Sequence, residues 1–136
     1  MIIVVGSTFE ARHQNGFTLI EVLVVTVIIG MLAAIAIPKF SKIKEKAYMA
    51  AMKSDLRNLI TVQEEYFANN STYTTDKVAL NFTESAGGTV TIVVTAGPPV
   101  GFSATSLHTA TASTCAIYVA TAPVAPANNE GEPKCT

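Results

Sequence analysis

The sequence predicts an α+β fold in which one long N-terminal helix packs on a small antiparallel sheet of three or four strands. Residues 17–38 are almost wholly apolar, and in residues 39–69 apolar side chains recur every three or four positions, which is typical of a helix with one buried face. Beyond residue 70, threonine, valine and alanine replace the long charged side chains, and glycine and proline separate short β-branched runs. The two halves of the chain therefore predict a helix followed by a sheet.

The apolar segment is long enough to cross a membrane. A helix of residues 17–38 rises about 1.5 Å per residue, which matches the roughly 30 Å of bilayer hydrocarbon. Glu21 is the one carboxylate in this segment, and an ionisable side chain at such depth indicates a function and a partner. A cut between Gly16 and Phe17 would supply that partner, because the new α-amino group lies about one helical turn before Glu21. The two charges can pair within one chain or between staggered chains, and the second arrangement makes the helix a polymerisation device.

Residues 16–21, Gly-Phe-Thr-Leu-Ile-Glu, together with the apolar run that ends at Pro38, resemble the N-terminus of type IV prepilins. The motif is specific, because it joins a small residue at the cut, a hydrophobic residue after it, a glutamate and a span of the right length. A weaker likeness to the PilA-like, type IVa major pilins extends to the late pair Cys115 and Cys135.

This resemblance implies that a prepilin peptidase cleaves after Gly16 and methylates the amino group of Phe17. It also implies that Glu21 and Thr18 act in filament assembly. The expected organisation of the chain is a cleaved leader, a transmembrane and polymerisation helix, the amphipathic half of the same helix, and a globular sheet head with a C-terminal disulfide loop, in residues 1–16, 17–38, 39–69 and 70–136.

The long helix has one weak region. Pro38 cannot donate a hydrogen bond to the carbonyl of Ala34, and Gly30 is a poor helix former, so residues 30–38 are the place where we expect the helix to bend or melt. The resemblance implies that this region loosens in the fibre. Beyond it the apolar periodicity predicts one buried stripe, made of Phe40, Ile43, Ala47, Ala51, Leu56, Leu59, Ile60, Tyr66 and Phe67, and residues 69–71 end the helix.

Three strands are predicted in the second half of the chain. Residues 89–95 are rich in β-branched side chains, and residues 100–107 and 114–121 alternate less regularly. We expect one face of the sheet to pack on residues 56–67 of the helix and the other face to meet water. The segment 122–133, rich in proline, asparagine and alanine, is predicted to be a loop.

Cys115 and Cys135 are the two cysteines of the chain. They form no CxxC motif and no histidine cluster lies near them, so a zinc site is disfavoured and a disulfide is favoured. A disulfide would place this half of the protein outside the reducing cytosol. Closure of the C-terminal loop would stabilise the fold by about 3 kcal/mol in the chain-entropy model.

The sequence shows no catalytic or nucleotide-binding motif. His13 lies in the leader and His108 stands alone, so no acid–base pair is visible. With 14% charged residues and a formal net charge of −1, the chain as a whole has no strong field for nucleic acid or anionic membranes. The cations of residues 39–57 predict a solvated helix face or salt bridges between subunits. We therefore predict a protein that is not an enzyme, needs no cofactor or metal, and does not take nucleic acid as a main partner.

The predicted function is that of a structural subunit, the major pilin of a type IV pilus, that polymerises through its N-terminal helix. The resemblance implies an inner-membrane precursor that becomes an extracellular pilus with roles in adhesion, twitching motility or DNA uptake. Its implied partners are further copies of the chain in a helical filament, a prepilin peptidase, an assembly platform, an ATPase motor and a secretin. Two related alternatives stay open: a minor pilin, and a type II secretion pseudopilin, whose family is expected to carry a calcium site in place of the C-terminal disulfide. A monomeric binding module or enzyme with one span would not need Glu21.

Overall fold

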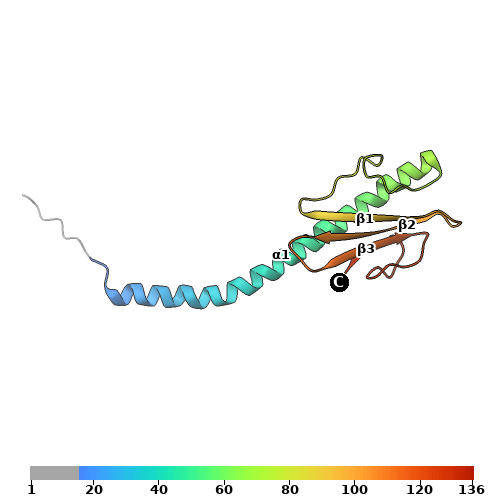
Figure 1. The fold of residues 1–136 in the computed structure, drawn as a ribbon. Helices are drawn as coiled ribbons and strands as arrows, with labels where there is room; N and C mark the ends of the chain where they lie inside the picture. The colour runs from blue at the N-terminus through green and yellow to red at the C-terminus, as the bar shows by residue number, and fades with distance from the viewer. Residues whose placement is uncertain (1–15) are drawn as a thin grey trace, which may run out of the picture. The chain divides into compact units, whose positions relative to one another are not determined.

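The computed structural model describes residues 16–136, so the predicted leader, apart from Gly16, lies outside the described residues. One helix, α1 (Leu19–Asn70), is followed by four strands: β1 (Gly88–Thr95), β2 (Gly101–His108), β3 (Thr114–Val119) and β4 (Lys134–Cys135) (Figure 1). The predicted α+β fold is confirmed. The chain divides after Pro38 into two compact units, residues 1–38 and 39–136.

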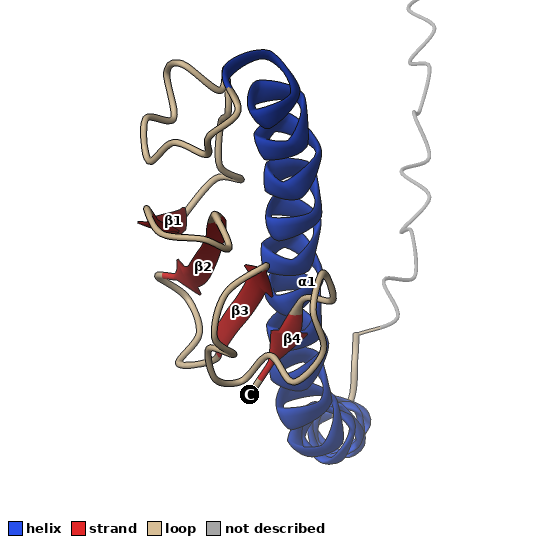
Figure 2. Ribbon diagram, turned by 90° about the vertical axis from the view of Figure 1, so that its right-hand side faces the viewer, coloured by secondary structure: helices blue, strands red, loops and turns tan. Residues whose placement is uncertain are grey.

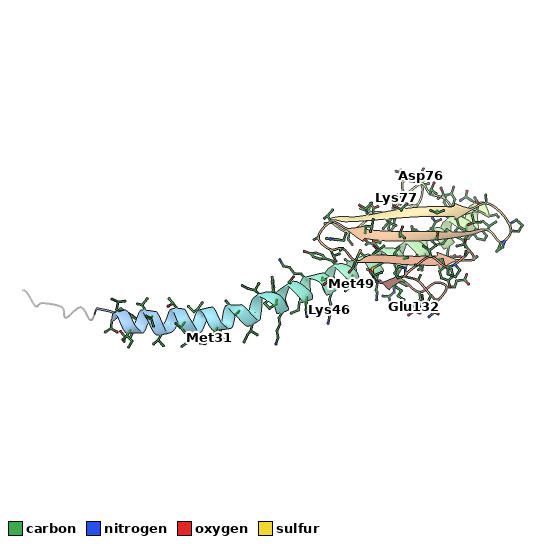
Figure 3. All side chains as sticks on the ribbon, turned by 60° about the horizontal axis from the view of Figure 1, so that its bottom comes forward. Met31, Lys46, Met49, Asp76, Lys77 and Glu132 are labelled. Carbon is green, nitrogen blue, oxygen red and sulfur yellow. A yellow bond between two sulfur atoms is a disulfide. The ribbon has the colours of Figure 1, made fainter. Side chains whose placement is uncertain are left out.

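The first unit consists of the apolar part of α1. Its large side chains are exposed, from Leu19 at 86% to Ile37 at 70%, and Figure 3 shows side chains projecting from it on all sides, Met31 among them. Within residues 16–136, α1 is the one helix that is long and apolar enough to cross a membrane. The helix continues through Gly30 and Pro38, so melting of this region stays a prediction.

The second unit begins at Lys39 and contains the sheet, which lies along one side of the second half of α1 (Figure 2). The strands follow one another in the order β1-β2-β3-β4, and all neighbours are antiparallel. β3 ends at Val119, earlier than expected, because Ala120 adopts a positive φ of 52° that breaks the strand. β4 was not predicted as a strand. It pairs with β3 at Cys115 and Ala116.

The face of α1 that packs on the sheet differs from the predicted stripe. Met52, Leu56 and Leu59 are fully buried, whereas Phe40 and Ile43 are 59% and 63% exposed. At about 100° per residue, Phe40 and Ile43 lie on the opposite side of the helix from these three core residues. The predicted stripe was therefore wrong at Phe40 and Ile43 and correct at Leu56 and Leu59. Further along the helix, the predicted residues Ile60, Tyr66 and Phe67 are partly buried and pack against the same core. The core also contains Tyr73, Leu80, Phe82, Val90, Ile92, Phe102, Ala104, Cys115 and Ile117.

Two buried polar residues of α1 tie down the αβ loop, residues 71–87. The Asp55 carboxylate accepts hydrogen bonds from Ser85 N at 3.0 Å and from Ser85 Oγ at 2.7 Å. The Gln63 side chain donates to Thr74 O at 2.6 Å and accepts from Thr74 N at 3.2 Å. Because buried polar groups need partners, these four bonds fix the path of the loop over the helix.

A third contact of the αβ loop protects the sheet edge at β1. Glu84 forms an ion pair with Lys77 and accepts a hydrogen bond from Val90 N at 3.0 Å. The Lys77 hydrogen bond holds the pKa of Glu84 below its usual value. A capped backbone N–H on an edge strand is one donor fewer for pairing with another chain.

The outer face of the sheet is covered at β3, contrary to the expectation that it meets water. Ala116 and Tyr118 point away from the helix and pack against Ala127 and Val124 of the C-terminal loop. The Tyr118 hydroxyl donates to Asn128 O at 3.0 Å, and Gly131 N donates to Tyr118 O at 2.9 Å. The disulfide between Cys115 and Cys135 closes this loop, as predicted.

We predict that replacing both cysteines, Cys115→Ala with Cys135→Ala, lowers the free energy of unfolding of the second unit by about 3 kcal/mol, since a loop across 20 positions gains chain entropy when it opens. Denaturant titration of the full chain in detergent, followed by near-ultraviolet circular dichroism, measures this loss. Ser106→Ala is the matched control, because Ser106 faces Cys115 across the sheet and its buried hydroxyl has no hydrogen-bond partner among residues 16–136. An unchanged midpoint in the double variant would contradict the prediction.

Candidate functional site

The candidate site lies at the start of α1, where Thr18 and Glu21 form a reciprocal pair. Thr18 N and Thr18 Oγ1 both donate to Glu21 Oε2, each at 2.8 Å. In return, Glu21 N donates to Thr18 Oγ1 at 3.3 Å. This arrangement is a capping box, with Thr18 as N-cap and Glu21 three residues later.

The local sequence explains why the pair forms. The first N–H groups of a helix have no carbonyl partner within it, so a hydroxyl and a carboxylate at this spacing satisfy two of them. The negative charge also lies in the first turn of α1, at the positive end of the helix dipole. In an apolar surrounding these bonds matter more than in water, because no solvent can replace them.

The cap uses only one of the two carboxylate oxygens of Glu21. Within the described residues, Oε1 of Glu21 has no hydrogen-bond partner, while Oε2 has two. Glu21 also lines a shallow groove with Phe17, Ile20, Val24 and Val25. A carboxylate that is held in one orientation and keeps a free oxygen beside an apolar groove can accept a hydrogen bond from an incoming cation.

The structure brings together only part of the predicted site. Phe17 precedes the cap, is 80% exposed and shares the groove with Glu21. Gly16 is likewise exposed and non-helical. Gly30 has open space where a Cβ would be, so no neighbour within the described residues requires glycine there. Pro38 lies inside α1 at the end of the first unit, and the two remaining predicted residues, Cys115 and Cys135, belong to the second unit.

Sequence reasoning singled out Thr18 and Glu21 but missed that they bind each other. The signal was available, because a threonine followed by a glutamate three positions later, in front of an apolar run, is the sequence pattern of a capping box. It also missed the surroundings of His108, which stacks on Tyr48 with ring centroids 4.3 Å apart and bonds Ala86 O at 3.1 Å. No local pattern links residues so far apart in the chain.

Residues 11–37 match the family model of the prokaryotic N-terminal methylation motif. The matched residues include the capped start of α1 and most of its exposed apolar part.

Comparison with curated proteins identifies similar chains. The chain is 38% identical to the type IV major pilin protein PilA of Myxococcus xanthus over 81 residues, which are 60% of this chain and 36% of that protein. It is 39% identical to type II secretion system core protein G of Aeromonas hydrophila over 72 residues, 53% of this chain and 50% of that protein. It is 38% identical to the type IV wide pilus major component PilA4 of Thermus thermophilus over 69 residues, 51% of this chain and 53% of that protein.

Over the matched part, the motif and these relatives make the chain similar to type IV pilins and to a secretion-system core protein. The matched part covers between about a third and about half of the length of the three relatives. Their names are those of pilus components and of a secretion-system core protein, and none is the name of an enzyme.

We predict that Thr18→Ala speeds hydrogen exchange of the Glu21 amide about fivefold, since loss of an N-cap costs roughly 1 kcal/mol. Nuclear magnetic resonance of the full chain in detergent micelles measures this rate. Thr18→Ser keeps the hydroxyl and should preserve protection. Thr26→Ala is the matched control, because Thr26 donates only to Leu23 O and caps nothing. Equal exchange in Thr18→Ala and the parent chain would show that the box does not hold the helix start.

Proposed function

We propose that this chain is the major subunit of a type IV pilus and polymerises through the apolar half of α1 after cleavage between Gly16 and Phe17. The observation that carries the proposal is the Glu21 carboxylate. The Thr18 cap holds it in place on an otherwise apolar, exposed helix, and one of its oxygens has no hydrogen-bond partner within residues 16–136. Neither a membrane anchor alone nor a soluble head would need a charge at this position.

The exposed apolar surface needs an environment other than water. The large apolar side chains from Phe17 to Ile37 are between 46% and 86% exposed in this unit, and an extended apolar surface of this kind indicates a membrane or a protein partner. In the proposed cycle the helix first lies in the inner membrane and then leaves it to pack against copies of itself. The apolar side chains thereby exchange lipid contacts for protein contacts.

The charge at Glu21 gives this packing its register. After cleavage, Phe17 carries an ammonium group, and the free oxygen of Glu21 in a neighbouring subunit can accept a hydrogen bond from it. A subunit docked out of register would leave both charges buried and unpaired, which costs about 3–5 kcal/mol. Thr18 acts in this scheme as a positioning residue, since it orients the carboxylate that the neighbour meets.

The proposed partners follow from the same cycle. A prepilin peptidase cleaves the precursor and methylates Phe17, and an assembly platform, an ATPase motor and a secretin extract the subunit and pass it to the cell surface. We propose that residues 30–38 loosen during this transfer, because Gly30 and Pro38 weaken the helix there. Adhesion, motility and DNA uptake are the roles that such a pilus would serve.

A type II secretion pseudopilin is the second candidate, and the similarity to core protein G favours it. A pseudopilin would share the cleavage site, Phe17 and Glu21. The disulfide between Cys115 and Cys135 supports the major pilin instead, because the resemblance to major pilins includes this late pair. Deletion of the gene separates the two candidates: loss of all surface fibres in negative-stain micrographs supports the pilin, and loss of protein secretion with fibres retained supports the pseudopilin.

We predict that Glu21→Ala is inserted and cleaved like the parent chain but yields at least about tenfold fewer fibres, since an unpaired Phe17 ammonium in the fibre core costs several kcal/mol. Fibre yield in shear fractions, read beside precursor processing on a blot, measures this effect. Gly16→Val should instead leave a longer precursor and no fibres.

Thr26→Val is the matched control, because it also removes a polar group from the apolar segment but touches no predicted pairing residue. Mass spectrometry of parental fibres should show subunits that begin at a methylated Phe17. Normal fibre yield from Glu21→Ala, or fibres whose subunits begin elsewhere, would overturn the proposed mechanism.

A further inference from the structure

We propose that Lys39, Lys42, Lys44 and Lys46 form a basic collar that binds the phosphate groups of anionic phospholipids. The collar would lie at the membrane surface from which the second unit emerges while α1 is still in the bilayer. This inference rests on the proposed membrane-anchored precursor, and it adds a lipid partner that filament assembly does not require.

The charge of the collar is local and uncompensated. The four lysines are exposed, and among residues 16–136 none of them forms an ion pair. The one acid between them, Glu45, accepts a hydrogen bond from Ser113 Oγ at 3.3 Å on the side of the sheet. Although the whole chain has a formal net charge of −1, these eight positions carry four cations and one anion, and a short basic cluster beside a membrane segment attracts anionic lipids.

The collar surrounds the helix instead of marking one face. Lys39, Lys42 and Lys46 are spaced by three and four positions and share a face, while Lys44 lies on the opposite side and sits 4.9 Å from the centroid of the Phe40 ring. A partner protein would contact one face of α1. Headgroups that surround a helix contact all of its faces, so the distribution of charge favours lipid over a protein partner.

Exposed apolar side chains lie within the same collar. Phe40 and Ile43 are 59% and 63% exposed, and both are directed away from the core of the second unit. A mixture of lysine, an aromatic ring and an aliphatic side chain is typical of the membrane interface, where the rings lie among the headgroups and the lysine stems lie along apolar surface.

The collar also has the dimensions of a headgroup layer. Lys39 to Lys46 extends about 10 Å along the helix, and the layer is roughly 5–8 Å thick on each side of the hydrocarbon. The collar is slightly longer than the headgroup layer is thick, but flexible lysine side chains can reach the layer from either end of the collar. Figure 3 shows Lys46 on α1 before Met49, which already packs against the core of the second unit, so the collar occupies the stretch of helix between the apolar segment and the sheet.

The test uses a single fluorescent reporter, because the chain contains no tryptophan. Phe40→Trp places an indole within the collar and keeps an aromatic ring beneath Lys44. The full chain is inserted into mixed vesicles of phosphatidylcholine and phosphatidylglycerol in which either one lipid or the other is brominated at its acyl chains. Quenching by each brominated lipid then reports which lipid lies next to the collar.

We expect brominated phosphatidylglycerol to quench the indole at least about twofold more than its share of the vesicle predicts, and high salt to abolish the excess. Replacing the four lysines by glutamine should remove the excess, and replacing them by arginine should keep it. Lys53→Gln with Arg57→Gln is the matched control, because these cations lie further along α1 beyond the collar.

Two results would overturn the proposal in distinguishable ways. Equal quenching by both lipids in the parental collar would remove the lipid partner while leaving membrane insertion, and with it the proposed function, intact. An indole quenched by neither lipid would show that the collar does not reach the membrane and would count against the membrane-anchored precursor as well.

Discussion

One constraint governs the first part of this protein: a carboxylate on an apolar helix must be neutralised by a counter-charge. The Thr18 cap donates two hydrogen bonds to one oxygen of Glu21 within the chain. It supplies no positive charge, so the negative charge of Glu21 still lacks a counter-charge in the single subunit. In the proposed cycle, cleavage before Phe17 would supply this counter-charge about one helical turn before Glu21. This missing counter-charge is the basis of the proposed filament, because the Phe17 ammonium of a neighbouring chain can pair with Glu21 in only one register.

The second unit is stabilised by its own core, loop contacts and disulfide. Met52, Leu56 and Leu59 provide the helix side of a small core, and small cores are marginal. Polar contacts from Asp55 and Gln63 hold the αβ loop, and the disulfide holds the C-terminal loop. Burial, and the hydrogen bond that the Tyr73 hydroxyl donates to Glu64 Oε1 at 2.9 Å, raise the pKa of Tyr73 to about 12, so this hydroxyl stays protonated at any physiological pH. These contacts all lie within the second unit.

The α+β fold, the long helix, three of the strands and the candidate site were predictable because each depends on local composition or spacing. The buried face of α1 could not be predicted, since apolar side chains occur on both sides of the helix in residues 39–51. Only the position of the sheet determines that Met52 is buried while Phe40 and Ile43 are exposed. β4 has two residues and depends on its pairing with β3 beside Cys115, which no local propensity reveals. The capping box was visible as spacing, but its geometry required coordinates.

In the proposed filament, Glu21 of one subunit pairs with the Phe17 ammonium of another. Solid-state nuclear magnetic resonance of fibres assembled from two subunit pools tests it directly, with nitrogen-15 phenylalanine in one pool and carbon-13 glutamate in the other. We expect a dipolar contact between the Phe17 nitrogen and the Glu21 carboxyl carbon in mixed fibres, and its loss when the carbon-labelled pool carries Glu21→Gln. A contact that appears only when both labels are on the same chain would show that the pair is intramolecular and would contradict the proposed register mechanism.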